Sequence, residues 1–276
     1  MKKFTFALIA AMVLSVAAYA QEASEEIAVE ESPAISANIA GDFLSAYVWK
    51  GQVLNKEWVF QPEFYVGLPH NLYFDLWGTM DLSDSDSSCC PGTEGKWSEI
   101  DIEVGYDIPF ITFADFSVAG IYMTYPQDGP DEDYDLQASV SKELALTDNF
   151  SITPKLIFRH RLSDHDDWGL VGRLSPSWAI CDSLSFGVDC EVGYAGSYFV
   201  NHSYGSKDEA AFTHAQAIAK LSYSLTEKLS LALKGGYSTV IDSDLRDDMK
   251  AVDEDGNKAF PDVDYFFGGV SFSYDL

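Results

Sequence analysis

The sequence predicts an all-β membrane protein: a transmembrane antiparallel up-and-down β-barrel, best divided into twelve strands. Three observations predict this fold. The chain opens with a secretory signal, its remainder is rich in aromatic residues without any long apolar run, and its connections alternate between short and long. In lipid every backbone polar group needs a partner, and a closed sheet provides one while half of its side chains stay polar.

The first twenty residues have the three parts of a cleaved signal peptide. Lys2 and Lys3 precede an apolar stretch that runs to Val16, and small residues follow at Ala18 and Ala20. The stretch is shorter than the ~20 residues that a helical span requires, although an uncleaved N-terminal anchor helix is the alternative. The next segment is acidic and has too little apolar material to pack, so we expect it to be disordered. The predicted organisation is therefore a signal peptide at 1–20, an acidic tail at 21–36 and one barrel domain at 37–276.

Alternating apolar and polar residues define the expected strands, because successive side chains of a strand point to opposite faces. Between residues 72 and 82, leucine, phenylalanine and methionine alternate with Tyr73, Asp75 and Trp77. Segments 37–49 and 114–126 alternate less cleanly, so their faces are not assigned and a count of ten strands stays open. The strands are expected at 37–49, 58–68, 72–82, 97–108, 114–126, 134–145, 150–162, 168–180, 184–198, 211–225, 229–241 and 263–276.

The connections between these segments sort by length. Those after the second, sixth, eighth and tenth segments are short, whereas those after the odd segments are generally longer and richer in Asp, Ser and Gly. Outer-membrane barrels have short periplasmic turns and longer external loops in this alternation. Both ends of the barrel domain are then periplasmic, and the apolar last strand, ending at Leu276, resembles the signal read by barrel-assembly machinery.

One stretch has a more specific likeness. Ser45, Tyr47, Lys50 and Gly51, followed by a strand with Pro62 and then by Trp77-Gly78, resemble the start of the TorF-like putative porin family. Lys50 stands where that family usually has Arg. The likeness covers residues 40–85, and it implies a porin-like outer-membrane protein without catalytic residues.

The net charge of the chain limits its possible binding partners. The formal net charge is −27, and loss of Lys2 and Lys3 with the signal makes it more negative. Such a surface repels nucleic acid, which we exclude as a partner. We expect outer-membrane lipid, lipopolysaccharide, small hydrophilic solutes and, during biogenesis, the barrel-assembly machinery as partners, and the cell outer membrane as the location.

If the polar face of each strand points inward, the expected lumen carries opposite charges on two sides. Opposed charge across a wet pore orients polar solutes, so we expect a porin-like channel for passive diffusion of small hydrophilic solutes. Alternatively, long basic side chains fill the lumen with ion pairs, and the protein is a non-conducting structural or surface-interaction barrel with acidic cation-binding loops. The expected acidic wall is Glu63, Asp75, Asp81, Glu99, Asp101, Glu103 and Asp107, and the basic one is Lys155, Arg159, Arg161, Arg173, Lys220 and Lys234.

The sequence predicts neither an active site nor a defined metal site. His160 and His165 lie beside several acids, but His160 has lipid-facing parity and His165 is in a loop, so the two do not converge and we expect no enzyme. Oxygen-rich loops can hold Ca²⁺ or Mg²⁺ weakly, or can simply be hydrated; we expect no resident cofactor and no defined metal site. The loop acids are Asp128, Asp131, Glu132, Asp133, Asp164, Asp166, Asp167, Asp242, Asp244, Asp247, Asp248, Asp253, Glu254 and Asp255.

The sequence contains four cysteines. Cys89 and Cys90 are adjacent, and a vicinal bond, a bridge to another loop and free thiols all stay open for them. Cys181 and Cys190 flank one hairpin, but the tight turn puts Cys190 several residues beyond the position that faces Cys181. We expect no disulfide between these two.

Overall fold

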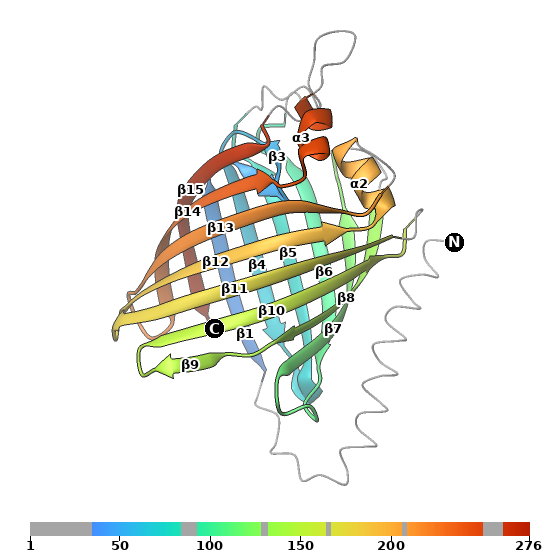
Figure 1. Ribbon diagram of the computed structural model, residues 1–276. Helices are drawn as coiled ribbons and strands as arrows, with labels where there is room; N and C mark the ends of the chain where they lie inside the picture. The colour runs from blue at the N-terminus through green and yellow to red at the C-terminus, as the bar shows by residue number, and fades with distance from the viewer. Residues whose placement is uncertain (1–34, 84–92, 128–131, 164–166, 206–208, 251–261) are drawn as a thin grey trace.

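The computed structural model describes residues 35–83, 93–127, 132–163, 167–205, 209–250 and 262–276 (Figure 1). The expected signal peptide at 1–20 and residues 21–34 of the expected tail lie outside this part of the chain. Ser36, which was assigned to the tail, already belongs to the first strand.

Twelve antiparallel strands close into a barrel, as the alternating pattern predicts. Each strand pairs with the next along the chain, and the ring closes where the last strand pairs with the first, with Phe43 opposite Val270. A short strand, β9, continues β8 and pairs with β10, so the two occupy one place in the ring. The barrel strands are β1 (Ser36–Leu44), β4 (Val59–Gly67), β5 (Leu72–Asp81), β6 (Trp97–Asp107), β7 (Asp115–Thr124), β8 (Glu132–Ser141) with β9 (Leu144–Thr147), β10 (Phe150–Arg161), β11 (Asp167–Cys181), β12 (Leu184–Ala195), β13 (Ala211–Ser224), β14 (Leu229–Val240) and β15 (Asp264–Asp275).

Three expected segments are wrong in extent. The first strand stops at Leu44, and the chain then forms a separate hairpin of β2 (Tyr47–Trp49) and β3 (Gln52–Asn55). The segment expected at 134–145 is broken between β8 and β9. The segment expected at 184–198 ends at Ala195, where Gly196 begins the helix α2 (Ser197–Tyr204).

The outer face of the barrel is apolar. Exposed large side chains such as Leu233 and Phe266, which are 61% and 78% exposed, alternate with lumen-facing residues. A water-soluble protein rarely exposes so much contiguous apolar surface.

Aromatic side chains form a band at each end of this outer face. Trp168, Tyr194 and Phe212 contact one another at the end that carries the long loops, with centroid distances of 5.7 and 5.0 Å. Phe150, Trp178 and Phe186 do so at the opposite end. Trp168 and Trp178 stand on the same strand, about ten residues apart, which is the length of strand that a tilted crossing of the bilayer needs. These are the two girdles of a membrane barrel.

Two short helices cover part of the long-loop end (Figure 1). They are α2 and α3 (Ser243–Lys250), and they share a small apolar core in which Val200, Tyr204, Leu245 and Met249 are almost fully buried. Among the described residues no helix is long and apolar enough to cross a membrane.

Candidate functional site

The strand register decides which side chains face the lumen. Lys234, which bonds Asp42 across the interior, lies opposite Lys220, and Asp42 lies opposite Gln61. The same alternation continues around the ring through the residues that the sequence singles out. It places on the inner face all thirteen of them: Glu63, Asp75, Asp81, Glu99, Asp101, Glu103, Asp107, Lys155, Arg159, Arg161, Arg173, Lys220 and Lys234.

The β2–β3 hairpin folds into the lumen from the long-loop end. Its turn consists of Lys50 and Gly51, with φ angles of 47° and 84°, and positive values at both positions define the turn that suits a two-residue hairpin. Glycine is needed at the second position because a Cβ there would crowd His214 on β13.

Four hydrogen bonds anchor this hairpin, and one of them runs from Asn55 Nδ2 on β3 to Asp81 Oδ1 on β5 at 2.7 Å. The Tyr47 hydroxyl donates to Glu99 Oε2 on β6 at 2.6 Å, and Gln52 Nε2 donates to the Ser203 carbonyl at 2.7 Å. The Tyr204 hydroxyl donates to the Lys50 carbonyl at 2.6 Å. The hairpin is therefore joined both to the barrel wall and to α2.

The apolar side chains under the hairpin explain why two strands alternate poorly. Leu44 on β1 points inward and packs with Tyr47 and Val59. Ile121 and Met123 on β7 also point inward, are each 2% exposed, and line a cavity with the hairpin. Because the hairpin buries them, these lumen positions are apolar, and the two-face pattern of 37–49 and 114–126 is lost.

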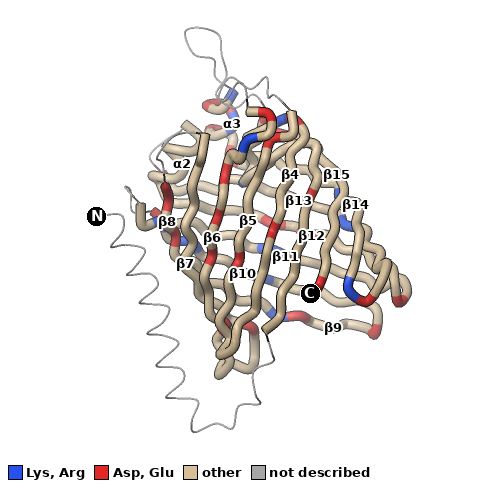
Figure 2. Tube along the Cα trace, turned by 180° about the vertical axis from the view of Figure 1, so that it is seen from behind, with Lys and Arg blue, Asp and Glu red and all other residues tan. Residues whose placement is uncertain are grey.

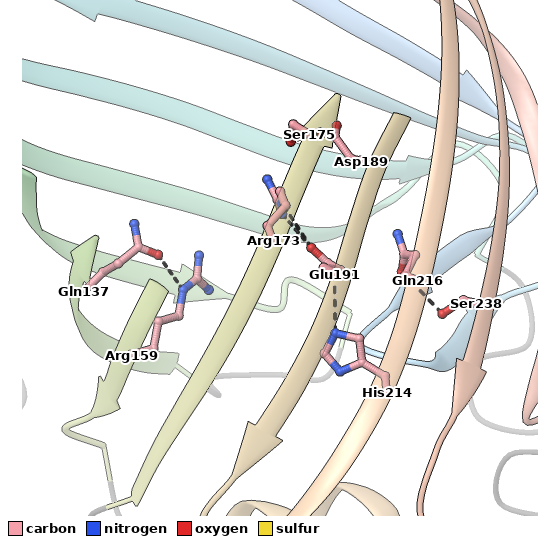
Figure 3. Close-up of polar contacts among 9 residues, drawn as sticks. All are labelled: Gln137, Arg159, Arg173, Ser175, Asp189, Glu191, His214, Gln216 and Ser238. Carbon is pink, nitrogen blue, oxygen red and sulfur yellow. Dashed lines mark hydrogen bonds and ion pairs between the residues drawn. The ribbon is translucent and has the colours of Figure 1, made fainter. Parts of the chain in front are cut away.

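Basic residues of the lumen are partly neutralised by acids on the adjacent strand or, for Lys234, on the next strand but one; Figure 3 shows the pair of Arg173 and Glu191. Arg173 donates to Glu191 at 2.7 Å, and His214 lies 3.4 Å from the same carboxylate. Arg161 bonds Asp133 and Asp135 at 3.0 and 3.2 Å. Lys234 bonds Asp42. Sequence reasoning does not name Asp42, Asp135 or Glu191, and it wrongly assigns Asp133, which lies on β8, to a loop. The alternation of these acids with apolar neighbours along the strands could have identified them.

The acids predicted for the opposite wall have different partners. Within the described chain none of them pairs with a basic side chain. Glu99 accepts a hydrogen bond from Tyr47, and Glu103 accepts one from Tyr73 at 2.7 Å. One carboxylate oxygen of Asp75 and one of Asp101 have no hydrogen-bond partner among the described residues. Figure 2 marks the acidic positions along β5 and β6 in red.

The hairpin separates two cavities of different character. One, of about 400 Å³, is lined by Glu63, Asp75, Glu99, Asp101 and Glu103. The other, of about 200 Å³, is lined by Lys50, Arg159 and Arg173 with Glu191 and His214. Val48, Trp49 and Arg159 border both. A third cavity, of about 150 Å³, lies toward the short-turn end beside Lys220 and Lys234.

Lys50 stands at the tip of the hairpin, outside the spanning strands. Its ammonium lies 4.3 Å from the Trp49 ring centroid and 4.5 Å from that of Phe199 on α2, within the range of cation–π attraction. Burial, followed by the charge of Arg159, lowers the pKa of Lys50 to about 7. Sequence reasoning places Lys50 just after the expected strand at 37–49, names it only in the TorF-like resemblance, and gives it no role in the lumen.

The remaining candidates do not converge. His160 faces outward, paired with Leu136 and Trp168, whereas His165 lies outside the described residues. The part of the chain that the structure describes contains no cluster of three or more metal-binding side chains. Many of the loop acids fall elsewhere: Asp128, Asp131, Asp164, Asp166, Asp253, Glu254 and Asp255 are outside the described residues, as are Cys89 and Cys90. Cys181 and Cys190 are both free thiols.

Comparison with known proteins identifies similar folds. No protein-family model matches the chain, and the curated proteins contain no match either, so the TorF-like resemblance over residues 40–85 stays a prediction. Among solved structures, the NanC porin has a TM-score of 0.51 at 10% identity, over 87% of this chain and 100% of that one. An outer membrane channel from Pseudomonas putida F1 has a TM-score of 0.49 at 9% identity, over 89% and 97%. The KdgM porin has 0.48 at 9%, over 87% and 99%.

At 10% identity the likeness to NanC shows the fold, that of a porin-like barrel. The closed ring, the apolar outer face and the two aromatic girdles then place the chain in the outer membrane.

Proposed function

We propose that this protein is a porin-like channel through which small hydrophilic solutes diffuse passively across the outer membrane. The observation that carries the proposal is the lumen, which holds cavities of about 400, 200 and 150 Å³ between polar and charged side chains. A barrel with a purely structural role could fill the same space with apolar side chains, as small barrels do.

The inward hairpin would be the narrowest part of the path. Solutes pass it beside uncompensated carboxylates on one side and beside Lys50 and Arg159 on the other. This division supports the opposed acidic and basic walls that the sequence suggests. Compensation by Asp42, Asp135 and Glu191 reduces the charge of the basic wall and so weakens the transverse field.

Conductance in a planar bilayer tests the proposal. The purified chain should give discrete current steps, and a variant in which residues 48–53 are replaced by two glycines should give larger ones because the constriction is gone. Heat-modifiable gel migration shows beforehand that both barrels are folded. Folded barrels that never conduct, with or without the hairpin tip, would refute the proposal.

A second function has one observation in its favour. The apolar core shared by α2 and α3 covers part of the long-loop end, as a non-conducting barrel with a surface-interaction role would require. The acidic loops would then bind Ca²⁺, Mg²⁺ or lipopolysaccharide. Under this alternative, deleting residues 243–261 abolishes binding of purified lipopolysaccharide and leaves the barrel folded, and conductance is absent before the deletion.

A further inference from the structure

Two basic residues that no acid compensates meet at the hairpin tip. Lys50 in the turn and Arg159 on β10 line the same cavity of about 200 Å³ and a smaller one of about 30 Å³ next to α2. Among the described residues neither makes an ion pair, whereas the neighbouring Arg161 and Arg173 both do.

Both groups have hydrogen-bonding capacity left. Arg159 donates through Nε to Gln137 Oε1 at 2.7 Å, and its two other guanidinium nitrogens have no partner in the described chain (Figure 3). The Lys50 ammonium lies over the rings of Trp49 and Phe199, and it makes no ion pair with a described residue. Cations in such a partly desolvated place attract an anion more strongly than they would in water.

Carboxylates that border the cavity do not cancel this charge. Glu191 borders the larger cavity and is held by both Arg173 and His214. Asp135 and Asp167 border the smaller one, where Asp135 is held by Arg161 and Asp167 accepts a hydrogen bond from the Phe199 backbone N–H. The excess charge of the cavity is therefore positive and concentrated at Lys50 and Arg159.

The apolar part of the lining indicates the rest of the ligand. Trp49, Ile157, Val171 and Phe199 surround the charged groups, and the Trp49 and Phe199 rings contact each other edge-on at 5.7 Å. The cavity is smaller than the ~300–1,000 Å³ sites that take drug-sized ligands, so the ligand is small.

We propose that this cavity binds a small organic carboxylate with an apolar body. Arg159 and Lys50 hold the carboxylate, and Trp49 and Phe199 contact the body. The proposal rests on the proposed channel function only in that the ligand reaches the site through the lumen.

Titration calorimetry of the folded full-length barrel in detergent, at pH 6, tests the site with three probes. Benzoate has the expected charge and body, benzamide has the same shape without charge, and inorganic phosphate has charge without a body. Benzoate should bind, and benzamide and phosphate should bind at least about tenfold more weakly, as loss of a charge-assisted contact predicts.

Variants assign the effect to the two residues. Arg159→Gln and Lys50→Met should each weaken benzoate binding about tenfold, and Lys50→Arg should restore it to within about threefold. Lys220→Met is the matched control, because Lys220 loses the same charge from a different lumen cavity and should leave binding unchanged. Equal affinity for the three probes, or an equal loss in Lys220→Met, would overturn the site.

The two proposals fail separately. A barrel that binds benzoate as described but does not conduct refutes the channel and leaves the site. A barrel that conducts but shows no preference for benzoate refutes the site and leaves the channel.

Discussion

Replacing Tyr47 by phenylalanine should loosen the inward hairpin without harming the barrel. Tyr47 is 7% exposed, and its hydroxyl donates to Glu99 Oε2 at 2.6 Å. Its ring also packs against Trp77 at a centroid distance of 5.9 Å, a contact that phenylalanine keeps. Tyr47→Phe therefore removes one hydrogen-bond anchor of four and leaves the packing in place.

The size of the effect follows from the kind of bond. A hydrogen bond to a charged group contributes about 1.5–3 kcal/mol. With about 2 kcal/mol, the ratio of seated to displaced hairpin falls roughly 30-fold, since 1.4 kcal/mol corresponds to a factor of ten. The anchors at Gln52, Asn55 and Tyr204 remain, so the hairpin should still be seated most of the time.

Single-channel recording measures this ratio as the fraction of time spent in a higher-conductance state. That fraction should rise roughly 30-fold in Tyr47→Phe, while the midpoint of thermal unfolding changes little. Tyr73→Phe is the matched control, because Tyr73 makes the same kind of bond, to Glu103 at 2.7 Å, within the barrel wall. Equal effects of the two substitutions, or no effect of Tyr47→Phe, would refute the anchoring role of this bond.

Three further substitutions or conditions test other parts of the lumen. Gly105→Ala should lower the free energy of unfolding by about 1–3 kcal/mol in urea titrations, because the new Cβ overlaps the Tyr73 ring. A variant as stable as the parent would contradict the close packing of Tyr73 on Gly105. Lys50 should lose its proton as the pH rises from 6 to 8, since its pKa is lowered to about 7. Anion preference measured by reversal potential should therefore fall over that range, and it should fall less in Lys50→Met; an equal fall in both would contradict the assignment to Lys50. Arg173→Met should lower the free energy of unfolding by about 1–3 kcal/mol, less than for a fully buried pair because Arg173 is 35% exposed. Adding Glu191→Gln should recover part of this loss, and no recovery would show that the ion pair is not its cause.

Much of the barrel could be predicted from local pattern. In segments such as 72–82 and 229–241, one face meets lipid and the other meets water, so the period of two is clear and the strand bounds are nearly right. The short connection at Asp182-Ser183 could be predicted in the same way, because a tight turn between paired strands leaves few residues unpaired.

The inward hairpin could not be predicted in this way. Its residues, from Tyr47 to Asn55, are bounded by strands and contain β-favouring side chains, so a local pattern assigns Tyr47–Trp49 to the strand before it. The signal that was present lies elsewhere, in the weak alternation of 37–49 and of 114–126, two segments far apart in sequence that contact the same hairpin. A pattern within one strand does not show which distant loop covers it.

A membrane barrel with a charged inner face was predictable from the sequence alone, because two-face strands are a local property of the chain. The way in which that inner face is used depends on the folded structure. The register of the β11–β12 hairpin brings Arg173 against Glu191, closure of the ring brings Lys234 against Asp42, and the folded β2–β3 hairpin brings Lys50 to Arg159. Charge compensation depends on distances across strands and loops, and those distances exist only once the barrel has closed.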